Sequence, residues 1–178
     1  MFTRTTMLKR PAALLAGVTA VLAITSAAPA LGVVKVVTDD RGDAPARFDI
    51  TRATVNNGDN RLSGKVAVDN LRYGGEQYFS FTFSPRNSPD IFFTAFSKLH
   101  ADNSLTNRLT VFNDIGEVHR IPCNVTSIWR PENDIVKVSI PRDCVDGLSG
   151  PQYMTSHLGP SARRAGQDHV IAGYVRQG

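Results

Sequence analysis

The sequence has only two cysteines and one tryptophan, and it lacks the short motifs that mark many enzymes. No Gly-x-Ser-x-Gly stretch presents a serine nucleophile, and no His-Glu-x-x-His stretch offers a pair of zinc ligands. Two thiols are too few for a four-cysteine zinc site, and their spacing is far from that of a Cys-x-x-Cys redox pair. No catalytic signature is therefore visible.

An apolar run long enough to cross a bilayer as a helix is also missing, since that needs about 20 residues. The longest run covers residues 12–24, follows three basic residues and precedes the small residues Ala28 and Ala30. This order is that of a secretory signal peptide. We predict a signal peptide at 1–30 and a secreted, extracellular mature chain of residues 31–178. The alternative is an uncleaved membrane anchor, but a helix over residues 12–24 spans only about 20 Å.

A large excess of one charge is absent as well. The chain has 20 Lys and Arg against 16 Asp and Glu, and Arg4, Lys9 and Arg10 lie in the predicted signal peptide, which leaves 17 against 16. This even balance provides no basic stripe for a phosphate backbone, so we expect no nucleic acid partner. We also expect a monomer with no membrane span after cleavage.

Two-residue alternation of apolar and polar side chains recurs throughout the mature chain, and no segment shows the 3.6-residue period of a helix. Leu62, Gly64 and Val66, for example, share one face of an extended segment. Turn residues separate the alternating runs. We predict strands at about 33–38, 48–55, 62–70, 77–84, 91–98, 105–112, 117–122, 126–130, 135–140, 152–156 and 169–175.

Short strands without helical crossovers favour an all-β fold. We predict a single domain over residues 31–178, an antiparallel two-sheet β-sandwich of jelly-roll or immunoglobulin-like type. Aromatic residues on both sides of the strand at 91–98 suggest that it is covered on both faces. We also expect a helical turn at 141–145 and a loop at 159–168.

Both cysteines, Cys123 and Cys144, lie in the predicted mature chain. An even pair of cysteines in an exported protein usually crosslinks, because the compartment is oxidising. We predict one disulfide, which closes a loop of about 22 residues and contributes about 3 kcal/mol in the chain-entropy model.

The densest acidic cluster in the sequence comprises Asp39, Asp40, Asp43 and Asp49. Calcium takes about six to eight oxygen ligands, so carboxylates crowded on a turn suit it. The spacing differs from that of an EF-hand loop. We name these four residues as candidate calcium ligands, and the alternative is an ordinary turn whose Asp side chains accept hydrogen bonds from backbone amides. No other cofactor is expected.

Aromatic side chains provide the better clue to binding. A platform on which a sugar ring stacks is expected among Tyr73, Tyr78, Phe92, Phe96 and Trp129, because aromatic faces are large, rigid and partly amphipathic. Trp129, Tyr78 and Tyr73 are the candidate ligand-binding residues. The alternative is that aromatic residues at two-residue spacing belong to the core.

Groups suited to catalysis are not gathered in the sequence. The four histidines have no partner motif, so each is interpreted as a surface or hydrogen-bonded structural residue. A glycosidase pair such as Glu76 with Glu117 or Glu132 stays open, because the separation of the carboxylates decides that case.

Several short motifs stand out in the mature chain: Asp40-x-Gly42-Asp43, Phe48-Asp49-Ile50, Trp129, and the stretch Val-Ser-Ile-Pro-Arg-Asp-Cys at 138–144. In these motifs the chain resembles small secreted actinobacterial β-sandwich proteins of unknown function, which carry an Asp-Gly-Asp turn and a Pro-Arg-x-Cys ending. The resemblance implies a β-sandwich with a Cys123–Cys144 bridge. It transfers no catalytic or binding residue.

We therefore expect a non-enzymatic extracellular binding module whose ligand is a carbohydrate, a cell-wall component or a protein, by analogy with other secreted sandwiches of this size. The alternative is a small secreted hydrolase with dispersed acidic or histidine catalytic residues. A third hypothesis is an envelope or interaction protein with no small ligand.

Overall fold

The structure, a computed structural model, describes residues 33–113, 116–145, 147–160 and 167–178. The predicted signal peptide and positions 161–166 of the predicted loop at 159–168 lie outside the described residues. The described chain is almost all β, which confirms the predicted fold class. Among the described residues, no helix has the length and apolar character that a membrane crossing requires.

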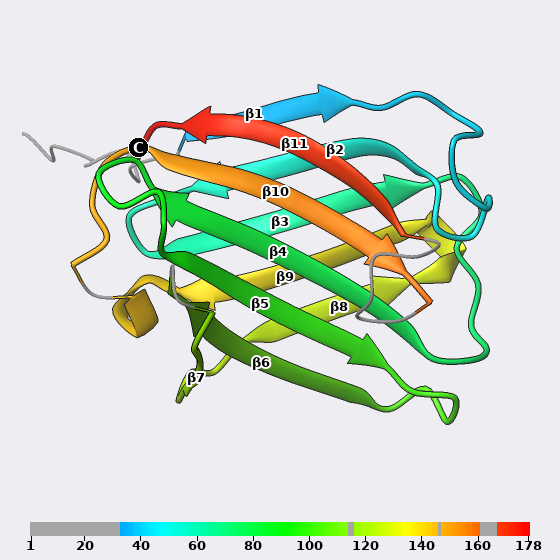
Figure 1. Cartoon of the computed structure of the whole chain (residues 1–178). Helices are drawn as coiled ribbons and strands as arrows, with labels where there is room; N and C mark the ends of the chain where they lie inside the picture. Colours follow the sequence, from blue (N-terminus) through cyan, green and yellow to red (C-terminus); the bar gives the residue numbers. More distant parts are fainter. Residues whose placement is uncertain (1–32, 114–115, 146, 161–166) are drawn as a thin grey trace, which may run out of the picture.

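The described strands form two antiparallel sheets that pack face to face (Figure 1). The strand order is β1-β2-β3-β9-β8 in the five-stranded sheet and β11-β10-β4-β5-β6-β7 in the six-stranded sheet. Each predicted strand is present, with ends that differ by at most three residues. The bounds are β1 Val33–Thr38, β2 Ile50–Asn57, β3 Arg61–Val68, β4 Gln77–Pro85, β5 Phe92–Leu99, β6 Leu105–Phe112, β7 Val118–Ile121, β8 Thr126–Arg130, β9 Ile135–Pro141, β10 Gln152–Gly159 and β11 Asp168–Val175.

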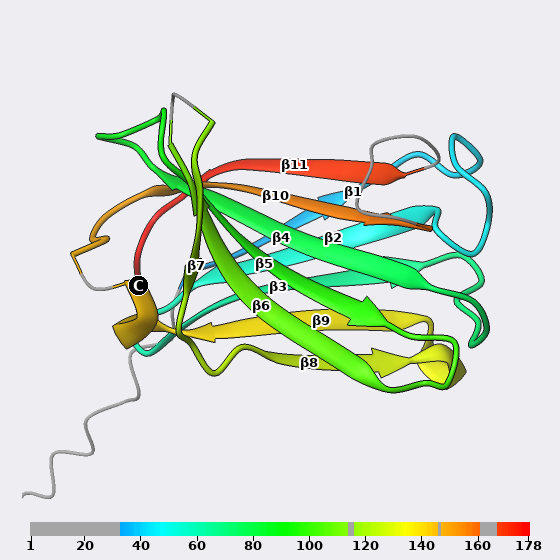
Figure 2. The same ribbon diagram turned by 60° about the horizontal axis from the view of Figure 1, so that its bottom comes forward.

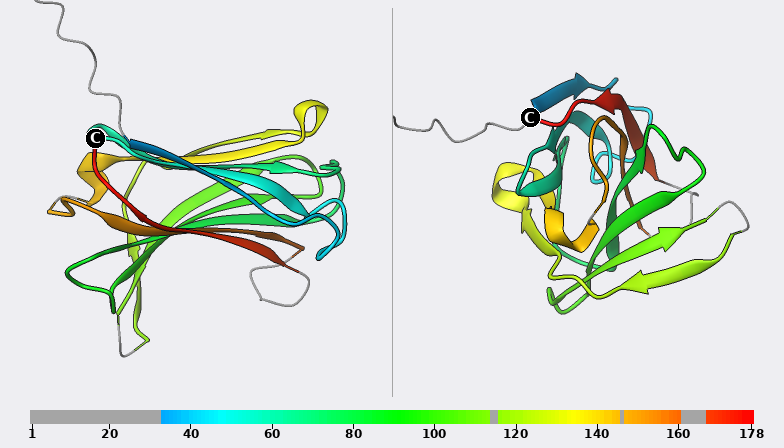
Figure 3. Two further views of the ribbon diagram at one scale, coloured as in Figure 1. Left: turned by 90° about the horizontal axis from the view of Figure 1, so that it is seen from above. Right: turned by 90° about the vertical axis from the view of Figure 1, so that its left-hand side faces the viewer.

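The chain passes from one sheet to the other after β3, β7 and β9 (Figure 2). The edge strands β1 and β11 belong to different sheets, yet they lie side by side along one edge of the sandwich (Figure 3). Residues from the beginning and the end of the described chain therefore meet there.

The core lies between the sheets and follows the alternation of the strands. Phe79, Phe81 and Phe83 of β4 are fully buried and face the apolar side of β3, where Leu62 and Val66 are fully buried as well. Gly64 lies between those two residues, and a Cβ atom there would come within 2.5 Å of the Phe81 ring. The absence of a side chain therefore lets β3 approach the Phe81 ring closely.

A disulfide joins Cys123, on the passage from β7 to β8, to Cys144, in the short 3₁₀ helix η2 (Arg142–Val145) after β9. The two Cα atoms are 5.5 Å apart. This bond confirms the predicted pairing and ties a crossover between the sheets to the end of β9. The η2 turn also confirms the predicted helical turn. A second 3₁₀ turn, η1 (Pro131–Asn133), connects β8 to β9.

Candidate functional site

The outer face of the six-stranded sheet is hollowed by three adjoining depressions, which together we call the trough. They run across the strands from β11 to β6, so the trough is made of outward-facing side chains from five neighbouring strands, together with Gln167, which directly precedes β11. Its lining residues are Tyr78, Ser80, Thr82, Thr94, Phe96, Lys98, Thr106, Arg108, Phe112, Thr155, His157, Gln167, His169 and Ile171.

The three depressions are continuous because neighbours share lining residues. The central one, of ≈ 260 Å³, shares Tyr78 and Phe96 with one of ≈ 270 Å³ over β5 and β6, and shares His157 and Gln167 with one of ≈ 440 Å³ over β10 and β11. Five strands at a spacing of about 4.8 Å extend about 19 Å. The trough is thus long and shallow rather than a single deep pocket.

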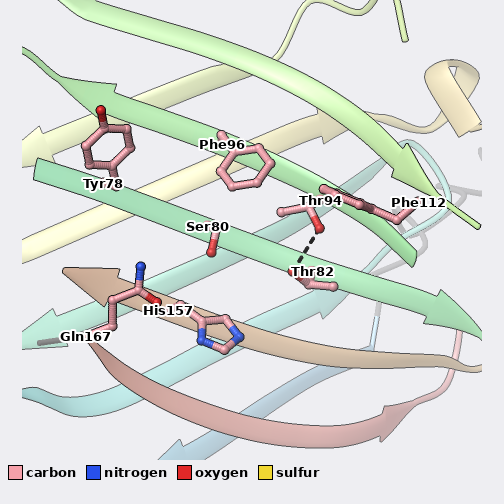
Figure 4. A pocket seen from close by; sticks show the side chains of 8 residues that line it. All are labelled: Tyr78, Ser80, Thr82, Thr94, Phe96, Phe112, His157 and Gln167. Carbon is pink, nitrogen blue, oxygen red and sulfur yellow. Dashed lines mark hydrogen bonds between the residues drawn. The ribbon is translucent and has the colours of Figure 1, made fainter. Parts of the chain in front are cut away.

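Three aromatic rings, Tyr78, Phe96 and Phe112, line the central depression (Figure 4). They come from β4, β5 and β6, and each is half-buried. The Arg108 guanidinium lies 4.8 Å from the centroid of the Phe96 ring, and the Lys98 ammonium lies 5.2 Å from that of Tyr78. Cations at these distances are attracted to the ring face.

A row of hydroxyls crosses the sheet beside the rings. Thr155, Thr82, Thr94 and Thr110 stand directly opposite one another on β10, β4, β5 and β6. The Oγ1 atoms of Thr82 and Thr94 are 3.1 Å apart, within hydrogen-bond distance (Figure 4). Thr155, Thr82 and Thr94 line the trough, whereas Thr110 is buried and its hydroxyl donates a hydrogen bond to the Thr94 carbonyl. Hydroxyls both donate and accept hydrogen bonds, so the three threonines of the trough can match the hydroxyls of a ligand.

A histidine pair, His157 and His169, lines the depression over β10 and β11. The residues stand opposite each other, and their rings stack with centroids 5.6 Å apart. The Nε2 atom of His157 lies 3.3 Å from the Thr155 Oγ1. The two histidines are 12 positions apart in the sequence and belong to no motif, so each is expected there to be a surface or hydrogen-bonded structural residue. Only the pairing of β10 with β11 makes them neighbours.

An ion pair lies at the other end of the trough. The Lys98 ammonium is 2.5 Å from the Glu76 carboxylate. The hydrogen bond from Lys98 lowers the pKa of Glu76, and the same bond raises the pKa of Lys98. Lys98 therefore stays charged beside the aromatic rings.

The three aromatic residues predicted as a sugar platform lie in different places. Tyr78 lines the trough. Tyr73 is 53% exposed in the connection from β3 to β4 and does not line the trough. Trp129 is only 6% exposed, and its Nε1 donates a hydrogen bond of 2.8 Å to the Ser97 Oγ of the opposite sheet. The prediction for Trp129 is corrected, because a ring packed in the core offers no face for stacking.

The prediction that the strand at 91–98 is covered on both faces is wrong. Phe92 on the outer face of β5 is 41% exposed, and Phe96 is half-buried in the trough. Inner residues of the same strand, such as Ala95 and Leu99, are buried in the core. The outward aromatic residues of β5 face solvent instead of a covering layer.

A second cluster of functional groups is acidic and lies at the edge where β1, β2 and β11 meet. One carboxylate oxygen each of Asp39, Asp43 and Asp168 lies within 4.8 Å of the others. Of the four predicted calcium ligands, the exposed Asp40 and the buried Asp49 are outside this group. Asp168 belongs to β11 and was not among the residues predicted from sequence, since 125 positions separate it from Asp43. These oxygens are of the kind that a calcium ion takes.

The acidic cluster is electrostatically unfavourable in the absence of a cation. Burial, together with the negative charge of Asp168, raises the pKa of Asp39. Burial also raises the pKa of Asp168, although the backbone N–H groups of Ile50 and His169 donate to its carboxylate. Both shifts disfavour the charged carboxylates.

The glutamates considered as a glycosidase pair do not meet in the trough. Glu76 pairs with Lys98, whereas Glu117 accepts a hydrogen bond of 2.9 Å from Asn113. Glu132 lies in η1, beside the five-stranded sheet. None of the three is among the residues that line the trough.

Comparison of the chain with protein-family models finds no match, and comparison with the curated proteins finds no similar sequence.

Proposed function

We propose that the protein is a secreted glycan-binding module and that the trough is its binding surface. The observation that carries this proposal is the side-by-side arrangement of the aromatic rings Tyr78, Phe96 and Phe112 with a row of threonine hydroxyls. A sugar ring has apolar C–H faces and a polar rim. Aromatic faces and hydroxyl groups complement these two surfaces.

The shape of the trough supports a chain of sugars over a compact small molecule. Two of its three depressions are smaller than the roughly 300–1,000 Å³ of a typical small-molecule pocket, and all three are shallow. An extended ligand can occupy adjoining depressions at once, and each additional contact then adds to the affinity.

The proposed location is outside the cell. The signal-peptide pattern at 1–30 supports export, and the Cys123–Cys144 disulfide is the kind of bond that persists in an oxidising compartment. The proposed ligand is therefore an extracellular polysaccharide or a cell-wall glycan.

The proposal is tested by screening the purified protein against a panel of soluble polysaccharides and peptidoglycan fragments, followed by calorimetric titration of the best ligand. Tyr78→Ala is expected to weaken binding about tenfold or more, because an aromatic ring loses its buried contact with the ligand. Tyr73→Ala is the matched control, since Tyr73 is an exposed tyrosine outside the trough, and it is expected to bind as the wild type does.

Two outcomes would contradict the proposal. Binding to no member of the panel would count against a glycan ligand and would favour an interaction protein. Cleavage of a glycan, measured as new reducing ends, would favour the hydrolase alternative, and His157→Ala and His169→Ala would then show whether the histidine pair takes part.

A further inference from the structure

The acidic cluster joins two distant parts of the chain. Asp39 and Asp43 lie on the connection from β1 to β2, and Asp168 is the first residue of β11. Oxygens on opposite sides of one calcium ion lie about 5 Å apart, twice the metal–oxygen distance of about 2.5 Å. The three carboxylate oxygens, all within 4.8 Å of one another, therefore fit around a single ion.

Asp168 is held in position before any ligand arrives. Its Oδ2 accepts a hydrogen bond of 2.5 Å from the Ile50 N–H, and its Oδ1 accepts one of 2.7 Å from the His169 N–H. Each carboxylate oxygen has a second lone pair, so both can still face a cation. A ligand fixed in this way loses little conformational entropy on binding.

A fourth carboxylate supplies an independent sign of a missing partner. Asp49 is only 2% exposed, and its Oδ1 accepts no hydrogen bond among the described residues. Its Oδ2 accepts a bond of 2.7 Å from the Gly42 N–H, so the side chain projects into the loop that carries Asp43. The negative charge of Asp49 also acts on Asp168. A buried carboxylate oxygen without a partner is costly, and a cation would compensate it.

The basic residues of the β1–β2 connection do not neutralise the negative charge of the acidic cluster. Arg41 forms its ion pair with Asp69, at 3.8 Å, and the guanidinium of Arg47 lies 4.4 Å from the Phe48 ring centroid. The Oδ2 atom of Asp39 is buried, and it too accepts no hydrogen bond among the described residues. The cluster thus holds several negative charges and no cationic side chain of its own segment.

We propose that Asp39, Asp43 and Asp168 bind a calcium ion, with the buried Asp49 beside them, and that this ion ties the β1–β2 connection to β11. Backbone carbonyls and waters complete the coordination of such a site. The proposal is independent of the glycan-binding proposal, since neither needs the other.

The test is calorimetric titration of the chelator-treated protein with calcium chloride, together with thermal melting in calcium and in chelator. We expect saturable binding and a higher melting temperature in calcium, because a ligand that binds only the folded state stabilises it. Asp43→Asn is expected to weaken calcium binding by more than about tenfold, since loss of a supporting contact alone costs that much at metal sites. Asp40→Asn is the matched control, an exposed acid of the same loop outside the cluster, and is expected to bind calcium as the wild type does.

Asp43 is exposed, so its replacement leaves the core intact and the result does not depend on folding. Asp168→Asn tests the ligand contributed by β11 and is also expected to lower the calcium affinity. No heat of binding with unchanged melting would overturn the proposal, as would equal losses in Asp43→Asn and Asp40→Asn. An equally strong response to magnesium would overturn the assignment to calcium.

Discussion

The outer faces of the two sheets share one strand plan but carry different side chains. On the six-stranded sheet the outward positions hold the rings of Tyr78, Phe92, Phe96 and Phe112 among threonines and the histidine pair. On the five-stranded sheet the corresponding outward positions of the described strands hold no aromatic residue. They are occupied by short side chains, isoleucines and the basic residues Arg52, Arg61, Lys65, Arg130 and Lys137.

This difference between the two faces indicates that the outward aromatic residues are not required for the fold and fit the proposed binding surface. Both faces border solvent, and both sheets close the same core from opposite sides. The five-stranded sheet shows that outward positions here need no rings for stability. The aromatic residues of the six-stranded face therefore support the proposed glycan-binding surface, because a ligand that covers a half-exposed ring buries additional apolar area.

The largest effect on glycan affinity is expected from removing a ring of the six-stranded face, with removal of an apolar side chain from the five-stranded face as the control. Phe96→Ala should weaken glycan binding about 10- to 100-fold, since a covered Phe contributes roughly 1.5–3 kcal/mol. Ile135→Ala, at an outward position of the five-stranded sheet, should leave the affinity unchanged. Calorimetric titration of both variants checks this, and equal losses would remove the distinction between the faces.

A smaller effect is expected from the hydroxyl row. Thr82→Val keeps the shape of the side chain but removes its hydroxyl, and loss of one hydrogen bond to a ligand costs about 1 kcal/mol, or about fivefold in affinity. Thr54→Val makes the same change on the five-stranded face and should have no effect on affinity. Unchanged binding by Thr82→Val would show that the hydroxyls do not contact the ligand.

Substitutions on the five-stranded face are expected to change the free energy of unfolding and not the glycan affinity. Lys65 and Lys137 stand directly opposite each other, and like charges in such pairs are destabilising. Lys137→Glu is expected to raise the free energy of unfolding by about 0.2–1 kcal/mol, a rise in melting temperature of at most about 4 °C. Lys137→Gln should give an intermediate rise. A lower melting temperature for Lys137→Glu would contradict the role of this pair.

The smallest effect concerns the ion pair at the end of the trough. The folded-state pKa of Glu76 is lowered below its ordinary value of 4.5, so its contribution to stability is present above that value and is lost as pH falls through the folded pKa. Solvent screens the exposed pair, so the contribution is small. The wild type should melt slightly higher than Glu76→Gln at pH about 6, and the difference should shrink as the pH falls below 4.5 and through the folded pKa of Glu76. A constant difference across this range would contradict the assignment.

The strands and the disulfide were predictable because their signals are local. Leu62, Gly64 and Val66 repeat every second residue, and that period identifies a strand whatever it pairs with. Cys123 and Cys144 needed only the redox chemistry of an exported chain. The resemblance to secreted actinobacterial sandwich proteins stays a prediction.

The candidate sites were predictable only in part, because alternation does not tell the inner face of a strand from the outer one. Trp129 and Tyr78 look alike in the sequence, yet one ring packs against the opposite sheet and the other lines the trough. For the same reason, the aromatic residues on both sides of β5 led to the wrong prediction that this strand is covered on both faces.

The sequence by itself determined where the chain is extended, where it turns, and which two sulfurs bond, since these follow from side-chain period and local chemistry. Only the tertiary structure decided which face of each strand meets the core and which strands become neighbours. It placed His157 opposite His169 and brought Asp168 to Asp39 and Asp43. Such proximities depend on sheet order and on packing between distant strands, which no short stretch of sequence encodes.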